Sequence, residues 1–149
     1  MQSLTLSETI DRFFTARQAA RYSPNTLRDY QNTYKKFGSF LGTDLPISKI
    51  NSTHITQFMA SEEVMAVSKK TALNYHTGLS SLWNWAIENS LVEKNVVRTV
   101  KPPSPEKREI IPYSRAEVLK LIQVSRSGRN SLRDEAIVLT LLDTGMRAS

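Results

Sequence analysis

Apolar side chains recur at intervals of three and four residues along almost the whole chain, and this spacing constrains the fold more than any other feature. Such intervals place the apolar side chains on one face of an α-helix and leave the opposite face polar. Amphipathic helices joined by short loops bury these faces against one another. The pattern therefore predicts an all-α protein, with a four-helix bundle in its first hundred residues.

Helix-capping residues indicate where the four helices begin. Thr5 and Glu8 have the spacing of a capping box, and Ser23 precedes a proline at the first helical position. The helices are expected to start near residues 6, 24, 51 and 69, with the second ending at Gly42 and the fourth near Asn89. Their predicted buried residues are Leu6, Ile10, Phe13, Phe14, Leu27, Tyr30, Tyr34, Phe37, Leu41, Ile55, Phe58, Met59, Ala72, Tyr75, Leu79, Leu82, Trp83 and Ala86.

A proline-rich segment at residues 101–109 separates this bundle from the rest of the chain. Three prolines in four positions among charged residues exclude a helix or a central strand, so an extended linker is expected. The predicted division is a helical domain at residues 1–100, the linker at 101–109 and a second region at 110–149.

The region after the linker predicts two further helices. Ile110 and Ile111 are compatible with a short strand, and Ser114 forms a second capping box with Glu117. Ser131 is the expected N-cap of the last helix. That helix is expected to end at Gly145, since a glycine adopts positive φ readily.

Composition narrows the possible functions. Twenty Lys and Arg against fourteen Asp and Glu give a net charge of +6, which is compatible with a nucleic-acid partner but does not establish one. Without cysteine there is no disulfide, thiolate zinc site or thiol nucleophile. No window resembles a signal peptide or a membrane span, so a cytoplasmic protein with no membrane partner is expected.

The sequence gives little support for a metal site or for a hydrolase active site. His54 and His76 lie on different predicted helices without acidic partners at ligand spacing, and His54 follows a possible capping residue, Thr53. Both histidines are expected to be structural or solvent-facing, and no metal or nucleotide site is expected. The serines at positions 23, 48, 68, 114 and 131 precede helices, which favours capping over nucleophilic catalysis.

Two helix faces are candidates for contact with DNA. The fourth helix carries a polar stripe of Lys70, Asn74, Gly78 and Ser81, in which lysine suits phosphate or guanine and asparagine suits an adenine edge. The second helix carries Thr26 in its first turn, with Arg28 and Lys35 on its outer side. A solvated helix face with ordinary caps is the alternative interpretation of both patterns.

The order of these signals resembles the core-binding domain of tyrosine recombinases, the phage-integrase family, followed by the opening of its catalytic domain. The resemblance before residue 100 depends on Ser23-Pro-Asn-Thr26, Tyr30 with Phe37, Ile55 to Phe58, Ser68-Lys-Lys-Thr71 with Asn74-Tyr75, Trp83 to Ile87, and Asn95. Beyond the linker it depends on Ser114-Arg-Ala-Glu117-Val, Arg133-Asp134-Glu-Ala136-Ile137 and Leu141-Leu-Asp-Thr144-Gly145-Met-Arg147-Ala-Ser149. Asn95 is followed by valine, where the family often has proline.

The resemblance implies a SAM-like four-helix bundle that clamps one face of a double-stranded DNA recombination half-site, followed by two helices of an incomplete catalytic domain. DNA contacts are expected from Thr26, Arg28, Lys35, Lys69, Lys70, Thr71 and Asn74. Arg147 corresponds to the first arginine of the pair that grips the scissile phosphate, a role that suits a fixed guanidinium. The parent protein would form a 3′-phosphotyrosyl intermediate and work as a tetramer on two DNA sites, without metal or nucleotide cofactor.

The resemblance also implies that the lysine, the second arginine box and the tyrosine nucleophile lie beyond residue 149. The 149-residue chain alone is therefore expected to be inactive, and no separate arm-binding domain is expected before residue 6. Two other functions stay open: a stand-alone, non-catalytic DNA-binding module or inhibitor of a full-length recombinase, and a helical protein-interaction domain without a DNA role.

Overall fold

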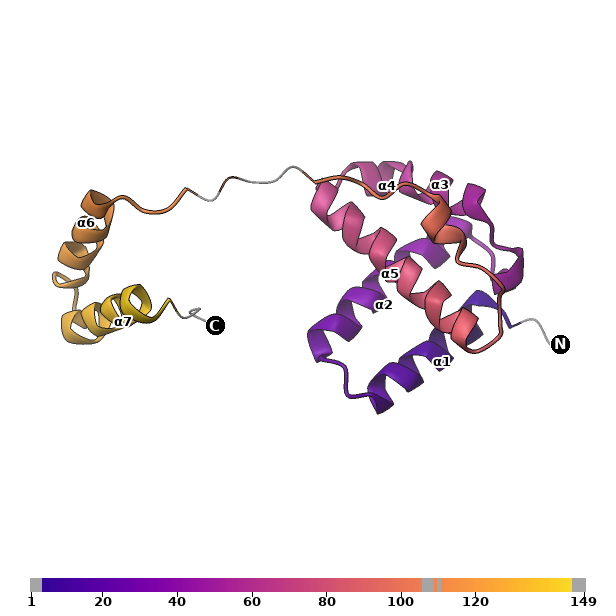
Figure 1. The fold of residues 1–149 in the computed structure, drawn as a ribbon, viewed down its shortest axis with the longest axis horizontal. Helices are drawn as coiled ribbons and strands as arrows, with labels where there is room; N and C mark the ends of the chain where they lie inside the picture. The colour runs from indigo at the N-terminus through magenta and orange to yellow at the C-terminus, as the bar shows by residue number, and fades with distance from the viewer. Residues whose placement is uncertain (1–3, 106–108, 110, 146–149) are drawn as a thin grey trace. The chain divides into compact units, whose positions relative to one another are not determined.

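The computed structural model of the chain describes residues 4–105, 109 and 111–145, and they form two compact units. The first unit spans residues 1–106 and the second residues 107–149 (Figure 1). The described residues form α-helices and short 3₁₀ helices without a strand, which confirms the predicted all-α class. The helices are α1 (Leu6–Ala19), α2 (Pro24–Leu41), η1 (Ile47–Lys49), α3 (Ser52–Met59), α4 (Glu62–Met65), α5 (Lys69–Glu88), η2 (Val96–Thr99), α6 (Arg115–Ser125) and α7 (Ser131–Thr144).

The core of the first unit forms around α5, which contacts α1, α2 and η2. Phe13 of α1 is fully buried, and its ring lies edge-on to Tyr30, Tyr34 and Trp85 at centroid distances of 5.3 to 5.9 Å. A second aromatic group joins Phe37 to Phe58 and Trp83. Edge-on aromatic pairs add to the stabilisation from apolar burial, so they fix how α1, α2, α3 and α5 meet.

Most of the predicted helix ends are confirmed. Thr5 and Glu8 form the expected capping box, Ser23 and Ser68 cap α2 and α5, and Gly42 ends α2 at a φ of +67°. The predicted Thr53 cap is wrong, because Asn51 caps α3 and forms a capping box with the His54 side chain. The apolar spacing did not predict the short helix α4, whose one turn is too short for a periodic pattern.

Polar side chains attach the segment after α5 to the core. The Asn95 amide nitrogen donates to the Ser80 carbonyl at 3.0 Å and to Asn84 Oδ1 at 2.8 Å, while its oxygen caps η2. His76, 7% exposed, lies with Nε2 2.8 Å from the Val100 carbonyl oxygen. These contacts extend the folded unit to residue 100.

In the second unit, α6 and α7 contact each other, and none of the described residues of either helix is buried. Ser114 and Glu117 form the predicted capping box, and Gly145 follows α7 at a φ of +63°. Two predictions differ from the structure: Ile111 is not in a strand, and the N-cap of α7 is Asn130. Ile110 and Arg147 lie outside the described residues.

Among the helices that the structure describes, none has both the length and the apolar content needed to cross a lipid bilayer.

Candidate nucleic-acid interface

A groove of about 270 Å³ lies between the N-terminal halves of α2 and α5. Figure 1 shows that the two helices cross and that both N-termini lie on the same side of the crossing. Three predicted DNA contacts, Thr26, Thr71 and Asn74, line this groove. The other lining residues are Asp29, Tyr30, Asn32, Thr33, Tyr75, Thr77 and Gly78. The structure therefore places Thr26 in one groove with Thr71 and Asn74, which follow it by 45 and 48 positions in the sequence.

The two helices open with the same capping geometry. Ser23 accepts a hydrogen bond from the Thr26 amide at 3.2 Å, and Ser68 accepts one from the Thr71 amide at 3.1 Å. The serine and threonine hydroxyl oxygens lie 2.8 Å apart at the start of α2 and 3.0 Å apart at the start of α5. Each helix N-terminus carries partial positive charge, so both favour an anion such as a backbone phosphate.

Exposed cations lie close to the groove in sequence, although its lining is mostly uncharged. Arg28 on α2 and Lys69 and Lys70 at the start of α5 are exposed, as is Asn74. Asp29 is the charged residue among the lining residues and would disfavour an anion beside it. The groove lining itself therefore contains one anionic side chain and no cationic one.

The polar stripe predicted on α5 is only partly available to a ligand. Gly78 is buried, and a Cβ at this position would lie 3.2 Å from Thr33 Cγ2 on α2. The Ser81 hydroxyl lies 3.1 Å from the Tyr30 hydroxyl, also on α2. Gly78 and Ser81 therefore contact α2, and the exposed part of the stripe consists of Lys70 and Asn74.

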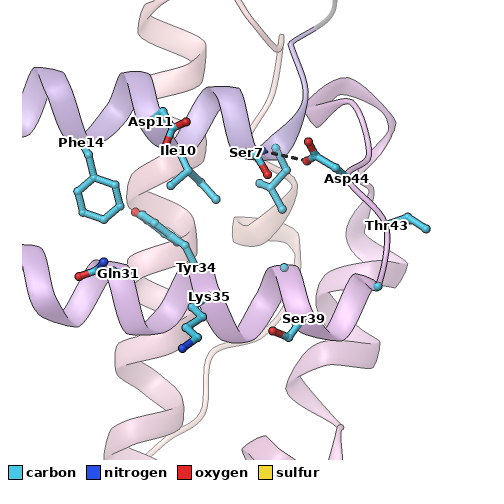
Figure 2. Close-up of a pocket in the computed structure, with 13 residues that line it drawn as sticks. Ser7, Ile10, Asp11, Phe14, Gln31, Tyr34, Lys35, Ser39, Thr43 and Asp44 are labelled. Carbon is cyan, nitrogen blue, oxygen red and sulfur yellow. Dashed lines mark hydrogen bonds between the residues drawn. The ribbon is translucent and has the colours of Figure 1, made fainter.

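Lys35 lies at a different groove, of about 650 Å³, between α1 and α2 (Figure 2). Ile10, Phe14 and Tyr34 contribute apolar surface to it. At one end, Asp44 Oδ1 accepts a 3.0 Å hydrogen bond from the Ser7 amide, which lowers the pKa of the Asp44 carboxyl. Lys35 does not join Thr26 and Asn74, and its DNA contact stays a prediction.

Lys36 has a role that the sequence did not indicate. Its ammonium pairs with the Glu63 carboxylate of α4, and this hydrogen bond raises the pKa of Lys36. Because the pair joins α2 to a helix that the periodicity did not predict, no sequence signal identified it. Lys36 is therefore a structural contact within the unit, in contrast to its neighbour Lys35.

The histidines have the structural roles that were expected of them. The His54 Nδ1 accepts from the Asn51 amide at 3.2 Å in the α3 cap, and His76 bonds the Val100 carbonyl. Within the described ranges, no group of three or more histidine or acidic residues is arranged to hold a metal ion.

Comparison with known proteins identifies the family. Residues 9–93 match the model of the phage integrase, N-terminal SAM-like domain family, and the chain belongs to that family. Tyrosine recombinase XerD of Mycobacterium tuberculosis is 26% identical over 141 residues. That alignment covers 84% of this chain and 45% of the relative, so the chain spans less than half the length of this curated relative.

Solved structures share the fold. The Tn1549 transposon integrase in complex with a circular intermediate DNA has a TM-score of 0.76 at 15% identity, covering 99% of this chain and 46% of that one. A lambda integrase tetramer bound to a Holliday junction has a TM-score of 0.67 at 22% identity, covering 86% and 37%. These likenesses show that the helical architecture occurs in integrases whose structures were solved on DNA.

Proposed function

We propose that residues 1–100 are the DNA-binding portion of a site-specific tyrosine recombinase, and that they bind duplex DNA through the N-terminal halves of α2 and α5. The observation that carries this proposal is the shared groove: two identically capped helix N-termini converge there, and Thr26, Thr71 and Asn74 line it. The family match and the DNA present in the complexes of the structural neighbours support the same partner.

The rest of the chain has a separate proposed role. Residues 101–109 would be a linker, and residues 110–149 would open the catalytic domain with α6 and α7. Arg147 would hold the scissile phosphate while a tyrosine outside the present sequence attacks it. The whole protein would act as a tetramer on two DNA sites through a 3′-phosphotyrosyl intermediate. The lambda integrase tetramer on a Holliday junction supports this assembly by analogy.

The test of the proposal is the salt dependence of DNA binding by the 149-residue chain. Each phosphate that a protein cation neutralises contributes about −0.9 to the slope of log K against log salt concentration, so a negative slope of several units is expected on duplex DNA. A chain that shows no salt-dependent binding to duplexes of mixed sequence would contradict the proposal. That result would favour a protein-interaction domain.

A further inference from the structure

The turn between α1 and α2 contains an arginine in a backbone conformation that favours glycine. Arg21 has a φ of +55°. Its amide donates to the Gln18 carbonyl at 2.9 Å, and the Tyr22 amide donates to the Arg17 carbonyl at 3.1 Å. This pair of hydrogen bonds is the Schellman motif, in which the left-handed residue after the C-cap is usually glycine. A side chain at this position strains the backbone, so arginine here lowers the stability of the folded chain relative to glycine.

A second arginine, Arg17, contacts aromatic side chains at this turn. The Arg17 guanidinium lies 4.8 Å from the Phe13 ring centroid and 4.9 Å from that of Tyr22, and it donates to the Tyr22 hydroxyl at 3.1 Å. The Arg17 guanidinium therefore makes its contacts within the protein. Arg21 is exposed, and its side chain has no hydrogen bond or ion pair among the residues that the structure describes. The fold thus presents one cation of this turn to solvent.

Arg21 lies two residues before Ser23, the N-cap of α2, whose first turn lines the groove through Thr26. Two residues of extended chain span at most about 7 Å, so Arg21 lies within that distance of the α2 N-cap, and the lining residue Thr26 follows the N-cap by three positions. We infer that Arg21 contacts a DNA backbone phosphate flanking the groove, and that the strained turn fixes the arginine in place for this contact. The inference depends on the proposed function and adds to it a contact that the sequence patterns did not indicate.

The chain contains a matched control. Ser90 has a φ of +57° after the C-cap of α5, and the same two hydrogen bonds join Ser90 to Ile87 and Leu91 to Ala86. Ser90 has no charge. It follows Gly78, the last α5 residue that lines the groove, by twelve positions, or roughly 18 Å along a helix. Replacing either residue with glycine relieves the same strain, but only one replacement removes a cation near the interface.

The experiment compares Arg21→Gly, Ser90→Gly and Arg21→Lys in the 149-residue chain. Tryptophan fluorescence reports the melting of the first unit alone, because both tryptophans, Trp83 and Trp85, belong to it. Both glycine variants should raise Tm by roughly 4 to 8 °C. Binding is measured by titration of a labelled mixed-sequence duplex of about 30 base pairs over a series of salt concentrations.

Arg21→Gly should reduce affinity roughly five- to tenfold at 0.1 M salt and lower the magnitude of the salt slope by about one unit, as expected for the loss of one phosphate contact. Ser90→Gly should leave affinity and slope unchanged, and Arg21→Lys should keep the slope because it keeps the charge. An unchanged salt slope in Arg21→Gly would contradict the proposed contact between Arg21 and a phosphate. An equal loss of affinity in Ser90→Gly would contradict it as well. An unchanged Tm in Arg21→Gly would contradict the claim that arginine strains the backbone at this position. Absence of salt-dependent binding by the unmodified chain would instead refute the proposed function itself.

Discussion

The Tyr34 hydroxyl donates a 3.0 Å hydrogen bond to the Gly78 carbonyl, at the point where α2 crosses α5. Gly78 lacks a side chain at the crossing, so Thr33 of α2 approaches its backbone closely. The position of this crossing determines which residues of the two helices line the groove. Residues on its N-terminal side, including Thr26 and Asn74, stay accessible, whereas Ser81 is bonded to Tyr30.

Replacing Lys69 and Lys70 together with alanine should weaken DNA binding and reduce the magnitude of the salt slope by up to about two units, one for each phosphate contact. The matched control is Lys49→Ala with Lys94→Ala, which removes the same charge from η1 and from the loop after α5, neither of which is the first turn of α2 or α5. Fluorescence anisotropy at several salt concentrations measures both pairs. A slope that falls equally in both would indicate a general charge effect and exclude the two lysines as specific contacts.

Gly78→Ala should destabilise the first unit by about 1 kcal/mol although alanine favours a helix, because the new methyl group would lie 3.2 Å from Thr33 Cγ2 and 3.3 Å from its hydroxyl oxygen. Thr33 cannot easily move, since it is 3% exposed and its hydroxyl bonds the Asp29 carbonyl. In a Thr33→Ala background the same change should become stabilising by up to about 1 kcal/mol, the difference in helix propensity. Urea unfolding of the two single variants and the double variant measures this coupling; additive effects would contradict it.

Tyr34→Phe should change how stability depends on alkaline pH. Burial raises the pKa of the Tyr34 phenol well above its usual value, an effect that neighbouring Tyr30 reinforces and Arg17 opposes. Above about pH 10 the unfolded phenol loses its proton and the folded one keeps it, so stability falls by up to about 1.4 kcal/mol per pH unit. The variant lacks this loss but should be about 1 kcal/mol less stable at pH 7, where the hydrogen bond to Gly78 is missing.

The two stability curves of the unmodified chain and Tyr34→Phe should therefore cross roughly one pH unit above the phenol's usual pKa of about 10. Chemical unfolding between neutral pH and pH 12, followed by tryptophan fluorescence, measures the crossing. Parallel curves would show that Tyr34 ionises equally in the folded and unfolded states.

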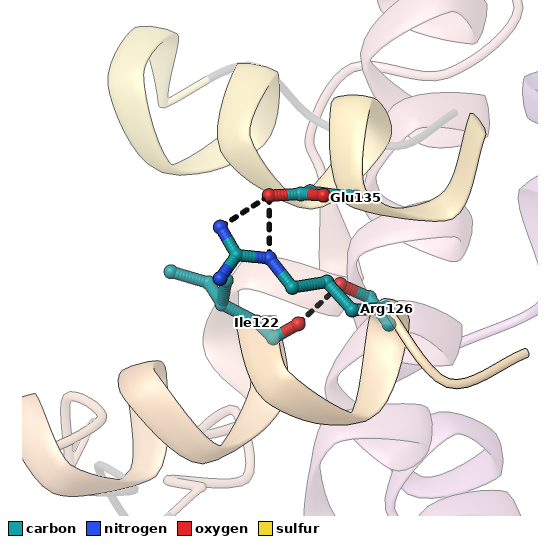
Figure 3. A network of polar contacts seen from close by, with 4 residues as sticks. Ile122, Arg126 and Glu135 are labelled. Carbon is teal, nitrogen blue, oxygen red and sulfur yellow. Dashed lines mark hydrogen bonds and ion pairs between the residues drawn. The ribbon is translucent and has the colours of Figure 1, made fainter. Parts of the chain in front are cut away.

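The helices α6 and α7 should exchange their amide hydrogens much faster than α5. None of their described residues is buried, and the Arg126 guanidinium joins them through Glu135 at 2.7 Å and 2.6 Å in an exposed ion pair (Figure 3). Exposed ion pairs contribute at most about 1 kcal/mol, and isolated helices of this length are marginal in water. Slow exchange in residues 137–142 of a verified monomer would contradict this expectation.

The variant Glu135→Gln tests how much the ion pair with Arg126 contributes. It removes the charge from the Glu135 side chain and keeps its shape, so exchange in α7 should change little, because an ion pair of this kind contributes weakly. A large acceleration of exchange confined to α6 and α7 would show that the pair, and not helix propensity, holds the two helices together.

The sequence by itself determined where most helices begin and end and which family the chain resembles. Capping depends on residues within one turn, as at Ser23 with Thr26 and Ser68 with Thr71, and the apolar period depends on spacing along one helix. Both are local properties, so they could be deduced without a tertiary structure. The sequence did not predict the one-turn helix α4, because four residues are too few to show a helical period of apolar residues.

Only the tertiary structure decided which helix faces meet. It brought Thr26 beside Asn74, placed Lys35 in the groove between α1 and α2, and buried Gly78 against Thr33. The groove with Thr26 and Asn74 and the burial of Gly78 depend on the crossing of α2 and α5, which is set by contacts between residues about 45 positions apart, such as Tyr34 with Gly78. The position of Lys35 depends on how α1 packs against α2. Helical periodicity defines the faces of each helix but not the partner of each face, because that choice minimises the free energy of the whole packed core.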